Sequence, residues 1–352
     1  MSKTNPGNFF EDFQLGREIV HATPRTLTTG DVALYTALTG GRFALASSDE
    51  FARALGFPAA PVDDLLAFHV VFGKTVPDVS LNAVANLGYA DGRFGAPVYP
   101  GDTLRTVSTV IGLKENSNRQ TGVVYVRSTG TNQRGEMVVE YVRWVMVRKR
   151  DKDSPAPAEV VPDLPRAVSA DRLVAPPFES WDATLAGSPH LWDDYQPGER
   201  IDHVDGMTIE EAEHAMATRL YQNTAKVHFN QHTEKEGRFG RRLIYGGHII
   251  SLARALSFNG LGSAVKLAAI NGGRHVAPTF AGDTIYAWSE VLERMEIPGR
   301  ADVGGLRLRT VALKDEPAGG FAFKDERGEH HPAVVLDFDY TVLMPRRAKT
   351  HG

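Results

Sequence analysis

The sequence predicts an α+β protein made of two tandem copies of one fold, each a long antiparallel sheet wrapped around a central helix. The first observation is a repeat. The segment FEDFQLGREIVH at 10–21 recurs as WDDYQPGERIDH at 192–203, and GRFGAPVYPGDTL at 92–104 recurs as GRHVAPTFAGDTI at 273–285. The offsets are 182 and 181 residues, and a shared offset indicates duplication. The second observation is that each copy holds one apolar helical stretch and ends in long alternating segments.

The repeat divides the chain into two domains and a linker. We expect the first copy to cover 9–150, the linker 151–190 and the second copy 191–346. Seven prolines in the linker exclude long helices and central strands and favour an extended path. A chain of 352 residues, of which 42% are hydrophobic, is long enough to bury a large core.

The elements are expected in the same order in both copies: a first strand, a turn, a polar helical stretch, one apolar helix and several long strands. In the first copy the apolar helix is expected from Leu65 to Phe72. Asp63 and Asp64 offer N-caps there, and Gly73 offers a C-cap.

In the second copy the apolar helix is expected from about Gly247 to Phe258, ended by Asn259 and Gly260. Glycines thus stand where the first copy has acidic caps. The last strands read EYVRWVMV at 140–147 and VLDFDYTVLM at 335–344, with alternating apolar residues. One central helix held in a wrapping antiparallel sheet describes the hot-dog fold, so we expect a tandem, or double, hot-dog.

Composition narrows the classes of function. The formal charge of −4 provides no general attraction to nucleic acid or to an anionic membrane. The absence of cysteine excludes disulfides, thiolate zinc sites, iron–sulfur clusters and a thiol nucleophile. The first residues lack the pattern of a secretion signal, and no stretch of 18 apolar residues occurs, so we expect a cytoplasmic protein.

The stretch NTAKVHFNQHTEKEGRFGRRLIYGGHIISLARAL at 223–256 resembles the MaoC-like, or (R)-specific, enoyl-CoA hydratase family. That family carries D-x-N-P-x-H, then R-F-G about ten residues later, then a glycine at the head of the hot-dog helix. With the R-F-G at 238–240 as the anchor, the family's His falls on His228 and its glycine on Gly247. Its Asp falls on Asn223, which is a departure from the pattern.

The resemblance implies a hydratase or dehydratase that reversibly adds water to an α,β-unsaturated acyl-CoA. It is greatest to the branch that acts on mesaconyl-CoA and forms β-methylmalyl-CoA. Such a reaction needs a base for water, an acid for the α-carbon and donors for the thioester oxygen, and it needs no cofactor beyond the coenzyme A of the substrate. His228 is the expected base, and the Gly247 amide is the expected donor.

Asn223 leaves the second proton-transfer group open, because an amide orients a hydrogen bond but does not exchange a proton near neutral pH. In one interpretation His228 makes both proton transfers while Asn223 holds the water or the His228 ring. In the other, the free carboxylate of a mesaconyl thioester takes the place of the missing Asp. The same alignment puts Arg42 and Ser47 in the Asp and His places of the first copy, so we expect catalysis in the second copy only.

Four basic residues near the motif are candidates for binding the coenzyme A phosphates or a substrate carboxylate: Lys226, Arg238, Arg241 and Arg242. His228 and His232 have the spacing of a helical zinc pair, but position 229 is Phe rather than Glu and no third ligand is indicated, so no metal is expected.

Two other functions remain open at this point, a hot-dog acyl-CoA thioesterase and a non-catalytic acyl-CoA-binding protein. The expected partner is an acyl-CoA substrate, with no nucleic acid and no membrane. Hot-dog domains pair by their sheets, so we expect a homodimer, with a monomer as the alternative because the two fused copies can pair with each other.

Overall fold

The computed structural model of the chain describes residues 3–320 and 323–347. Its sheet runs in the order β1-β3-β4-β5-β2-β8-β11-β10-β9-β6, with β7 paired to β9, and each pairing is antiparallel. The strands of the first copy are β1 (Glu18–Thr26), β2 (Ala83–Phe94), β3 (Thr103–Glu115), β4 (Thr121–Thr131) and β5 (Met137–Arg148). Those of the second are β6 (Arg200–Asp202), β7 (Met207–Thr208), β8 (Lys266–His275), β9 (Thr284–Glu296), β10 (Val303–Lys314) and β11 (Val334–Pro345).

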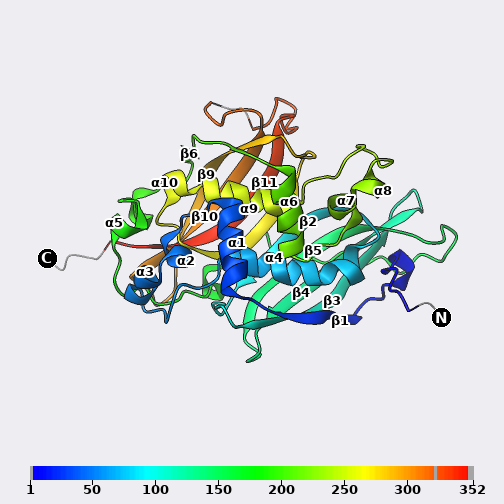
Figure 1. Cartoon of the computed structure of the whole chain (residues 1–352), viewed down its shortest axis with the longest axis horizontal. Coiled ribbons are helices and arrows are strands. Elements are labelled where there is room, and N and C mark those ends of the chain that lie inside the picture. The colour runs from blue at the N-terminus through cyan, green and yellow to red at the C-terminus, as the bar shows by residue number, and fades with distance from the viewer. Residues whose placement is uncertain (1–2, 321–322, 348–352) are drawn as a thin grey trace.

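The helices repeat in the same order in both copies (Figure 1). The first copy has η1 (Phe10–Asp12), α1 (Thr29–Thr39), α2 (Ala44–Ser47), α3 (Asp49–Ala54), α4 (Asp64–Thr75) and η2 (Val76–Ser80). The second has η4 (Trp192–Asp194), α6 (Glu211–Leu220), α7 (Lys226–Phe229), α8 (Gln231–Glu234), α9 (Gly246–Leu256) and α10 (Phe258–Leu261). The tandem hot-dog fold predicted from the sequence is confirmed, with α4 and α9 as the two central helices.

The spacing of the repeat is the same in structure as in sequence. The starts of α1 and α6, of α2 and α7, and of α4 and α9 each lie 182 residues apart. In each copy the repeated segment ends in a buried histidine, and the two histidines make equivalent contacts. His21 Nε2 lies 2.8 Å from Ser108 Oγ, and His203 Nε2 lies 2.8 Å from Ser289 Oγ. Both histidines therefore hold the sheet together rather than take part in chemistry.

The two copies join along β2 and β8, which makes one continuous sheet of both. Tyr89 and Arg93 of β2 stand opposite Gly273 and Ala269 of β8. At this seam α4 packs on the strands of the first copy and α9 on those of the second, and one hydrophobic core extends through both. The helices also touch each other, because His69 of α4 lies 2.8 Å from Ser251 of α9. These two residues are 182 positions apart, so they are equivalent, as expected of residues on a pseudo-two-fold axis.

Helix α4 begins as the sequence predicts, since Asp63 is its N-cap and accepts a 2.8 Å hydrogen bond from the Leu65 amide. The prediction that Gly73 caps its end is wrong. The helix runs through Gly73 to Thr75 and continues as the π-helical turn η2. A Cβ at Gly73 would lie 1.8 Å from the carbonyl oxygen of Tyr221, so this glycine permits close approach of the second copy.

Helix α9 ends earlier than the sequence predicts. Its last residue is Leu256, and the Ser257 hydroxyl donates a 2.7 Å hydrogen bond to the Arg254 carbonyl. Asn259 and Gly260, expected to end the helix, lie instead inside the short α10, where Gly260 has a φ of 103°. At its start α9 has no side-chain cap, in contrast to α4.

The segment 151–190 crosses from the first copy to the second along the surface of both. Its short helices are η3 (Ala170–Arg172) and α5 (Ala183–Ala186), and Val160 forms an isolated bridge with Leu113. The Val168 amide donates to Asn271 Oδ1 at 2.9 Å, and Trp181 packs edge-on against Phe51 at 5.3 Å. The segment is thus fixed along its length by both copies.

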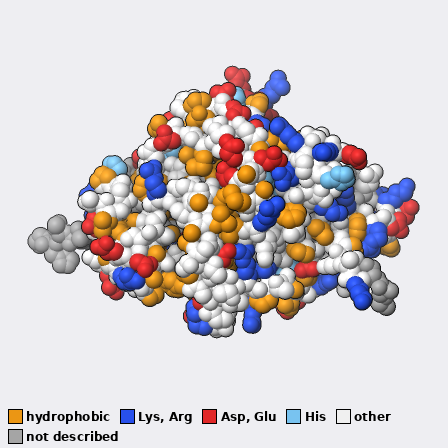
Figure 2. All heavy atoms as spheres, viewed as in Figure 1, with side chains coloured by type: hydrophobic (Ala, Val, Ile, Leu, Met, Phe, Trp, Pro, Cys, Tyr) orange, Lys and Arg blue, Asp and Glu red, His pale blue; other side chains and the backbone are white. Residues whose placement is uncertain are grey.

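The charged surface is mixed. Lys and Arg side chains are interspersed with Asp and Glu over the face shown in Figure 2.

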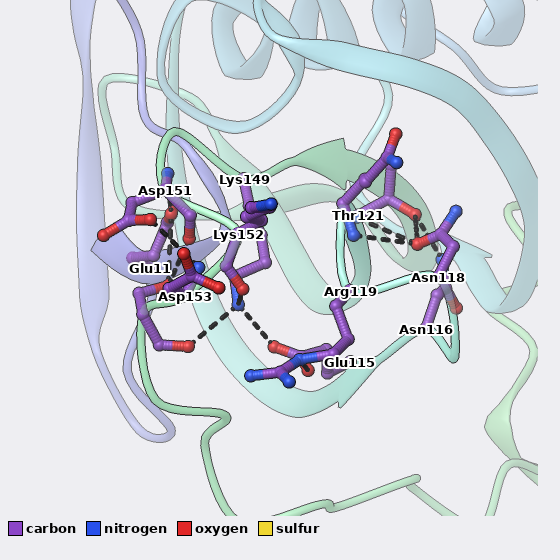
Figure 3. A network of polar contacts seen from close by, with 12 residues as sticks. Glu11, Glu115, Asn116, Asn118, Arg119, Thr121, Lys149, Asp151, Lys152 and Asp153 are labelled. Atoms are coloured by element: carbon purple, nitrogen blue, oxygen red, sulfur yellow. Dashed lines mark hydrogen bonds and ion pairs between the residues drawn. The ribbon is translucent and has the colours of Figure 1, made fainter.

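A groove of about 430 Å³ lies at the far end of the first copy, beside Lys149. Lys149 Nζ donates to Glu115 Oε2 at 2.6 Å, and Glu11 accepts from the Asp151 amide at 2.8 Å (Figure 3). This network anchors the start of the linker. No helix within the described ranges has the length and apolar character needed to span a membrane.

Candidate active site

His228 lies on α7, the short helix that follows the loop at Asn223. Its Nδ1 atom is 2.8 Å from the carbonyl oxygen of Leu243. A carbonyl only accepts, so Nδ1 carries the hydrogen and Nε2 holds the lone pair. Burial lowers the pKa of His228 to about 4, and the bond to Leu243 opposes the shift. His228 is therefore neutral at physiological pH, with Nε2 available as a proton acceptor.

Two more histidines surround His228. The ring of His214, on α6, lies 6.3 Å from that of His228, and His214 Nε2 accepts a 2.9 Å hydrogen bond from the Tyr245 amide. Burial, and next the neighbouring His228, lower the pKa of His214 to about 2. His248 Nε2 lies 2.8 Å from Glu213 Oε1. His214 thus belongs to α6, His248 is bound by Glu213 of the same helix, and the rings of His214 and His248 lie 6.3 Å apart.

The start of α9 is tightly covered by aromatic rings. A Cβ at Gly247 would lie 2.4 Å from the Tyr245 ring, and one at Gly246 would lie 2.4 Å from the His275 ring. Amides in the first turn of a helix have no partner inside it. Within the described ranges, no backbone hydrogen bond outside the helices and strands uses the Gly247 amide. In the part of the chain that the structure describes, the Gly247 N–H is accordingly a donor without an acceptor, and its role at the thioester oxygen stays a prediction.

Tyr245 completes the site and was not foreseen from the sequence. Its ring lies 5.6 Å from that of His228 and covers Gly247. Burial raises the pKa of the Tyr245 phenol well above its usual value. The hydroxyl therefore stays protonated and acts as a hydrogen-bond donor rather than as a base.

A chain of hydrogen bonds from the first copy orients Tyr245. The Tyr35 hydroxyl donates to Ser251 Oγ at 2.8 Å, so Ser251 passes its own hydrogen to His69 Nε2, also at 2.8 Å. The hydrogen on His69 then sits on Nδ1, which faces the Tyr245 oxygen at 3.4 Å. Tyr245 consequently accepts from His69 and keeps its own O–H for another acceptor.

Asn223 is buried, with only 1% of its surface exposed, and it shapes the loop before α7. Its Oδ1 accepts a 3.2 Å hydrogen bond from the Ala225 amide, which forms a turn typical of this residue type. The His228 ring is oriented through Nδ1 by the Leu243 carbonyl, and within the described ranges no hydrogen bond joins Asn223 to His228. The side-chain NH₂ group remains for a ligand or water.

The four basic residues expected to bind substrate lie on the exposed segment around α7 and α8. Lys226 and Arg238 are exposed, and Arg241 stacks on Phe280 with its Cζ 3.9 Å from the ring centre. Arg242 Nη2 forms a 2.6 Å ion pair with Glu211 Oε1. Lys226 thus lies on α7, the helix that carries His228, and the three arginines lie on the segment that follows α8. The exposed His232 lies on α8.

The first copy has no equivalent chemistry. The common offset of 182 places Gly41 and Ala46 opposite Asn223 and His228, so the alignment with Arg42 and Ser47 is wrong by one residue. The amide equivalent to that of Gly247 belongs to Leu65, and it already donates to the Asp63 carboxylate.

The cavity at this place in the first copy has a volume of only about 20 Å³, room for about one water molecule. Gly41, Ala46 and Asp63 line it. Within the described ranges, no group of three or more His, Asp or Glu residues is arranged to hold a metal ion.

Comparisons with known proteins agree on one family. The family model for mesaconyl-CoA hydratase matches residues 2–322. A β-methylmalyl-CoA dehydratase from Chloroflexus aurantiacus is 68% identical over 349 residues, with 98% of this chain and 99% of the relative covered. A mesaconyl-CoA hydratase from Cereibacter sphaeroides is 62% identical over 351 residues, with 98% and 100% covered.

Two solved structures are similar over nearly the whole chain. A MaoC domain protein dehydratase from Chloroflexus aurantiacus is 68% identical, with a TM-score of 0.97 and coverage of 99% of this chain and 100% of that one. A Mycobacterium tuberculosis protein described as having a double hotdog fold is 26% identical, with a TM-score of 0.77 and coverage of 97% and 99%. The likeness therefore includes both copies and the linker.

Proposed function

The chain belongs to the mesaconyl-CoA hydratase family, and we infer from this membership how the site around His228 works. The protein is a carbon–oxygen lyase that reversibly adds water to mesaconyl-CoA to give β-methylmalyl-CoA. The family, the reaction and the substrate predicted from the sequence are confirmed. The roles of individual residues are our proposal, and the observation that carries it is the free Nε2 atom of His228 next to the Tyr245 ring that covers Gly247.

His228 acts as the base in this proposal. Its Nε2 takes a proton from water while the oxygen of that water bonds to the β-carbon of the acyl group. The electron pair of the double bond moves toward the thioester oxygen, which becomes negatively charged. His228 then returns its proton to the α-carbon, so one water molecule is added in total and no other proton donor is consumed. The reverse sequence gives dehydration.

Gly247 and Tyr245 stabilise the charge on the thioester oxygen. The Gly247 amide has no acceptor, and the start of a helix carries a partial positive charge. The Tyr245 hydroxyl, which accepts from His69, supplies a second donor. In the same proposal the Asn223 NH₂ group holds the attacking water, because its Oδ1 is occupied by the Ala225 amide.

The exposed residues Lys226, Arg238 and Arg241 bind the phosphates of coenzyme A in this proposal. They are exposed, lie on the segment that leads to His228, and form no ion pair within the described ranges. Arg242 is less suited, because Glu211 already neutralises it. Their expected contribution is a salt-dependent KM rather than a change in kcat.

The reaction is tested by incubating the enzyme with mesaconyl-CoA and following the loss of absorbance of the conjugated thioester. We expect β-methylmalyl-CoA as the product, and no release of free coenzyme A when a thiol reagent is added. A site that pairs with a required group rejects analogues that lack it by several orders of magnitude, so crotonyl-CoA should react far more slowly. Release of free thiol without hydration would identify a thioesterase instead.

A further inference from the structure

Arg143 of β5 is a positive charge in the interior that has no carboxylate partner within the described ranges. Its exposed fraction is 0%. Among the fully buried side chains of the described ranges it is the largest. Nη2 donates to Thr75 Oγ1 at 2.7 Å and to Ser80 Oγ at 3.3 Å. Nε and Nη1 have no hydrogen-bond partner. A guanidinium left in this state is unfavourable, because buried charges in proteins are normally paired.

Other buried cations of the described ranges have their partners. Lys266 pairs with Asp64 at 2.7 Å, and Lys149 pairs with Glu115 at 2.6 Å. Arg254 is buried to a similar degree as Arg143, but it donates to Ser257 Oγ at 3.2 Å and to the carbonyl oxygen of Ala264. Two donor nitrogens without acceptors therefore distinguish Arg143 from the buried cations that have a structural role.

Arg143 is connected to the start of α9 through aromatic rings. Its Cζ lies 4.3 Å above the centre of the Phe72 ring, and the Phe72 ring is 5.6 Å from that of Tyr245. Burial raises the pKa of Tyr245, and the positive charge of Arg143 partly opposes that rise. Tyr245 in turn covers Gly247 and contacts His228. The unpaired charge and the proposed catalytic groups are thus linked by ring contacts through Phe72 and Tyr245, which belong to one hydrophobic cluster.

A second route leads to the same place. Arg143 stands opposite Tyr89 in the sheet, and the Tyr89 hydroxyl lies 3.3 Å from His275 Nε2. The His275 ring lies against Gly246, the first residue of α9. Arg143 therefore faces the helix start from the side of the first copy, whereas His228 approaches it from the second.

We propose that Arg143 binds the free carboxylate of the acyl group and is the residue that selects for it. This inference rests on the proposed function, because it assumes that the thioester oxygen lies at Gly247. In mesaconyl-CoA the carboxylate is attached to the β-carbon, the atom that receives the hydroxyl. One of its oxygens would accept a charge-assisted hydrogen bond from a vacant donor of Arg143, either Nε or Nη1, which point to different sides of the guanidinium.

Pairing also aids the chemistry. A free carboxylate next to the β-carbon repels an incoming water oxygen that is losing its proton. The guanidinium of Arg143 cancels that negative charge, so the β-carbon is more readily attacked. The arginines that follow α8 meet this requirement less well. Arg241 is exposed and stacks on Phe280, and Arg242, although its Nε is buried without a partner, is already neutralised by Glu211. The first copy thus supplies the specificity group although it carries no catalytic site.

The test compares mesaconyl-CoA with tigloyl-CoA, which has the same skeleton with a methyl group in place of the carboxylate. Arg143→Met should lower kcat/KM for mesaconyl-CoA at least about a thousandfold and leave that for tigloyl-CoA unchanged or raised. In a His228→Gln background, calorimetry should show that Arg143→Met weakens mesaconyl-CoA binding at least tenfold and does not weaken tigloyl-CoA binding. An equal fall for both thioesters, or no fall for either, would overturn the proposal.

Arg254→Met is the matched control, because it removes a buried arginine whose donors are occupied. We expect it to lower the melting temperature and to keep the preference for mesaconyl-CoA. Arg143→Met should keep or raise the melting temperature, because it removes an unpaired buried charge. In Arg143→Ala, millimolar guanidinium should restore part of the mesaconyl-CoA activity, and the absence of any restoration would count against a direct contact.

The proposed reaction and the proposed role of Arg143 can be refuted separately. If the wild-type enzyme does not hydrate mesaconyl-CoA, the proposed function is wrong. If the wild-type enzyme hydrates it and Arg143→Met retains the same preference over tigloyl-CoA, the reaction stands and the role of Arg143 is wrong.

Discussion

Replacing His228 with glutamine tests the proposed base directly. Glutamine has a similar size and its NH₂ group can still donate to the Leu243 carbonyl, so the loop before α8 should keep its shape. It offers no nitrogen lone pair to water. General acid–base catalysis contributes about 100- to 10,000-fold, so kcat should fall by at least about 100-fold. The melting temperature should change little.

The pKa of His228 sets the expected pH profile of the wild-type enzyme. With a pKa of about 4, about 90% of His228 is still in the base form at pH 5. With the ordinary value of 6.5, only about 3% would be. We therefore expect kcat/KM for mesaconyl-CoA, which reports the free enzyme, to be nearly flat between pH 5 and 8.

The assay is the initial rate of absorbance loss with mesaconyl-CoA, measured from pH 4 to 8 after the enzyme is shown to remain folded by circular dichroism. His232→Gln is the control, because His232 is an exposed neighbour on α8 and should leave the rate unchanged. An acidic limb of kcat/KM near pH 6.5, or a His228→Gln variant with near-wild-type activity, would refute the assignment of the base.

The remaining predictions concern the loop and the glycines. Asn223→Ala should lower kcat up to about tenfold, because an orienting hydrogen bond contributes roughly 0.5–1.5 kcal/mol. Asn223→Asp should not raise the rate of crotonyl-CoA hydration, because His228 makes both proton transfers; a gain would favour the interpretation in which the substrate carboxylate takes the place of the family's Asp. Gly247→Ala should lower kcat at least tenfold, because its Cβ would lie 2.4 Å from the Tyr245 ring; an unchanged rate would contradict the role of this amide. Gly73→Ala should lower the free energy of unfolding in urea by about 3 kcal/mol, since its Cβ would meet a backbone oxygen. For both glycine variants Gly319→Ala is the control, because its Cβ would contact no atom within 4 Å, and an equal effect there would remove the steric explanation.

The fold was predictable because its signals are local. The repeat, the apolar stretch of each central helix and the alternating strands are all visible in short segments. The roles of His228 and Gly247 stay predictions, which the sequence allows because their spacing lies within one segment of the family motif. The first turn of α9 confirms that Gly247 lies at a helix start.

The missed features depend on contacts between residues far apart in the sequence. Tyr245 precedes the two glycines and could have been noticed, but its orientation depends on His69, 176 positions away. Gly73 resembled a C-cap because glycine often ends helices. Glycine is required there because the Tyr221 backbone of the other copy leaves no room for a Cβ. Arg143 reads as one polar position in an alternating strand, and only the structure reveals that it is buried without a carboxylate.

The continuous sheet formed by β2 and β8 changes what dilution and mutation do to this site. If the two halves were separate chains, dilution below their dissociation constant would remove the half that carries His69, Phe72 and Arg143 from the half that carries His228. Here the linker keeps both halves at a high effective concentration, so the contacts of His69 and Phe72 with Tyr245 form within one chain. In a symmetric pair of identical chains every substitution appears twice. In a fused pair it appears once, so one half is free to lose catalysis while the other keeps it.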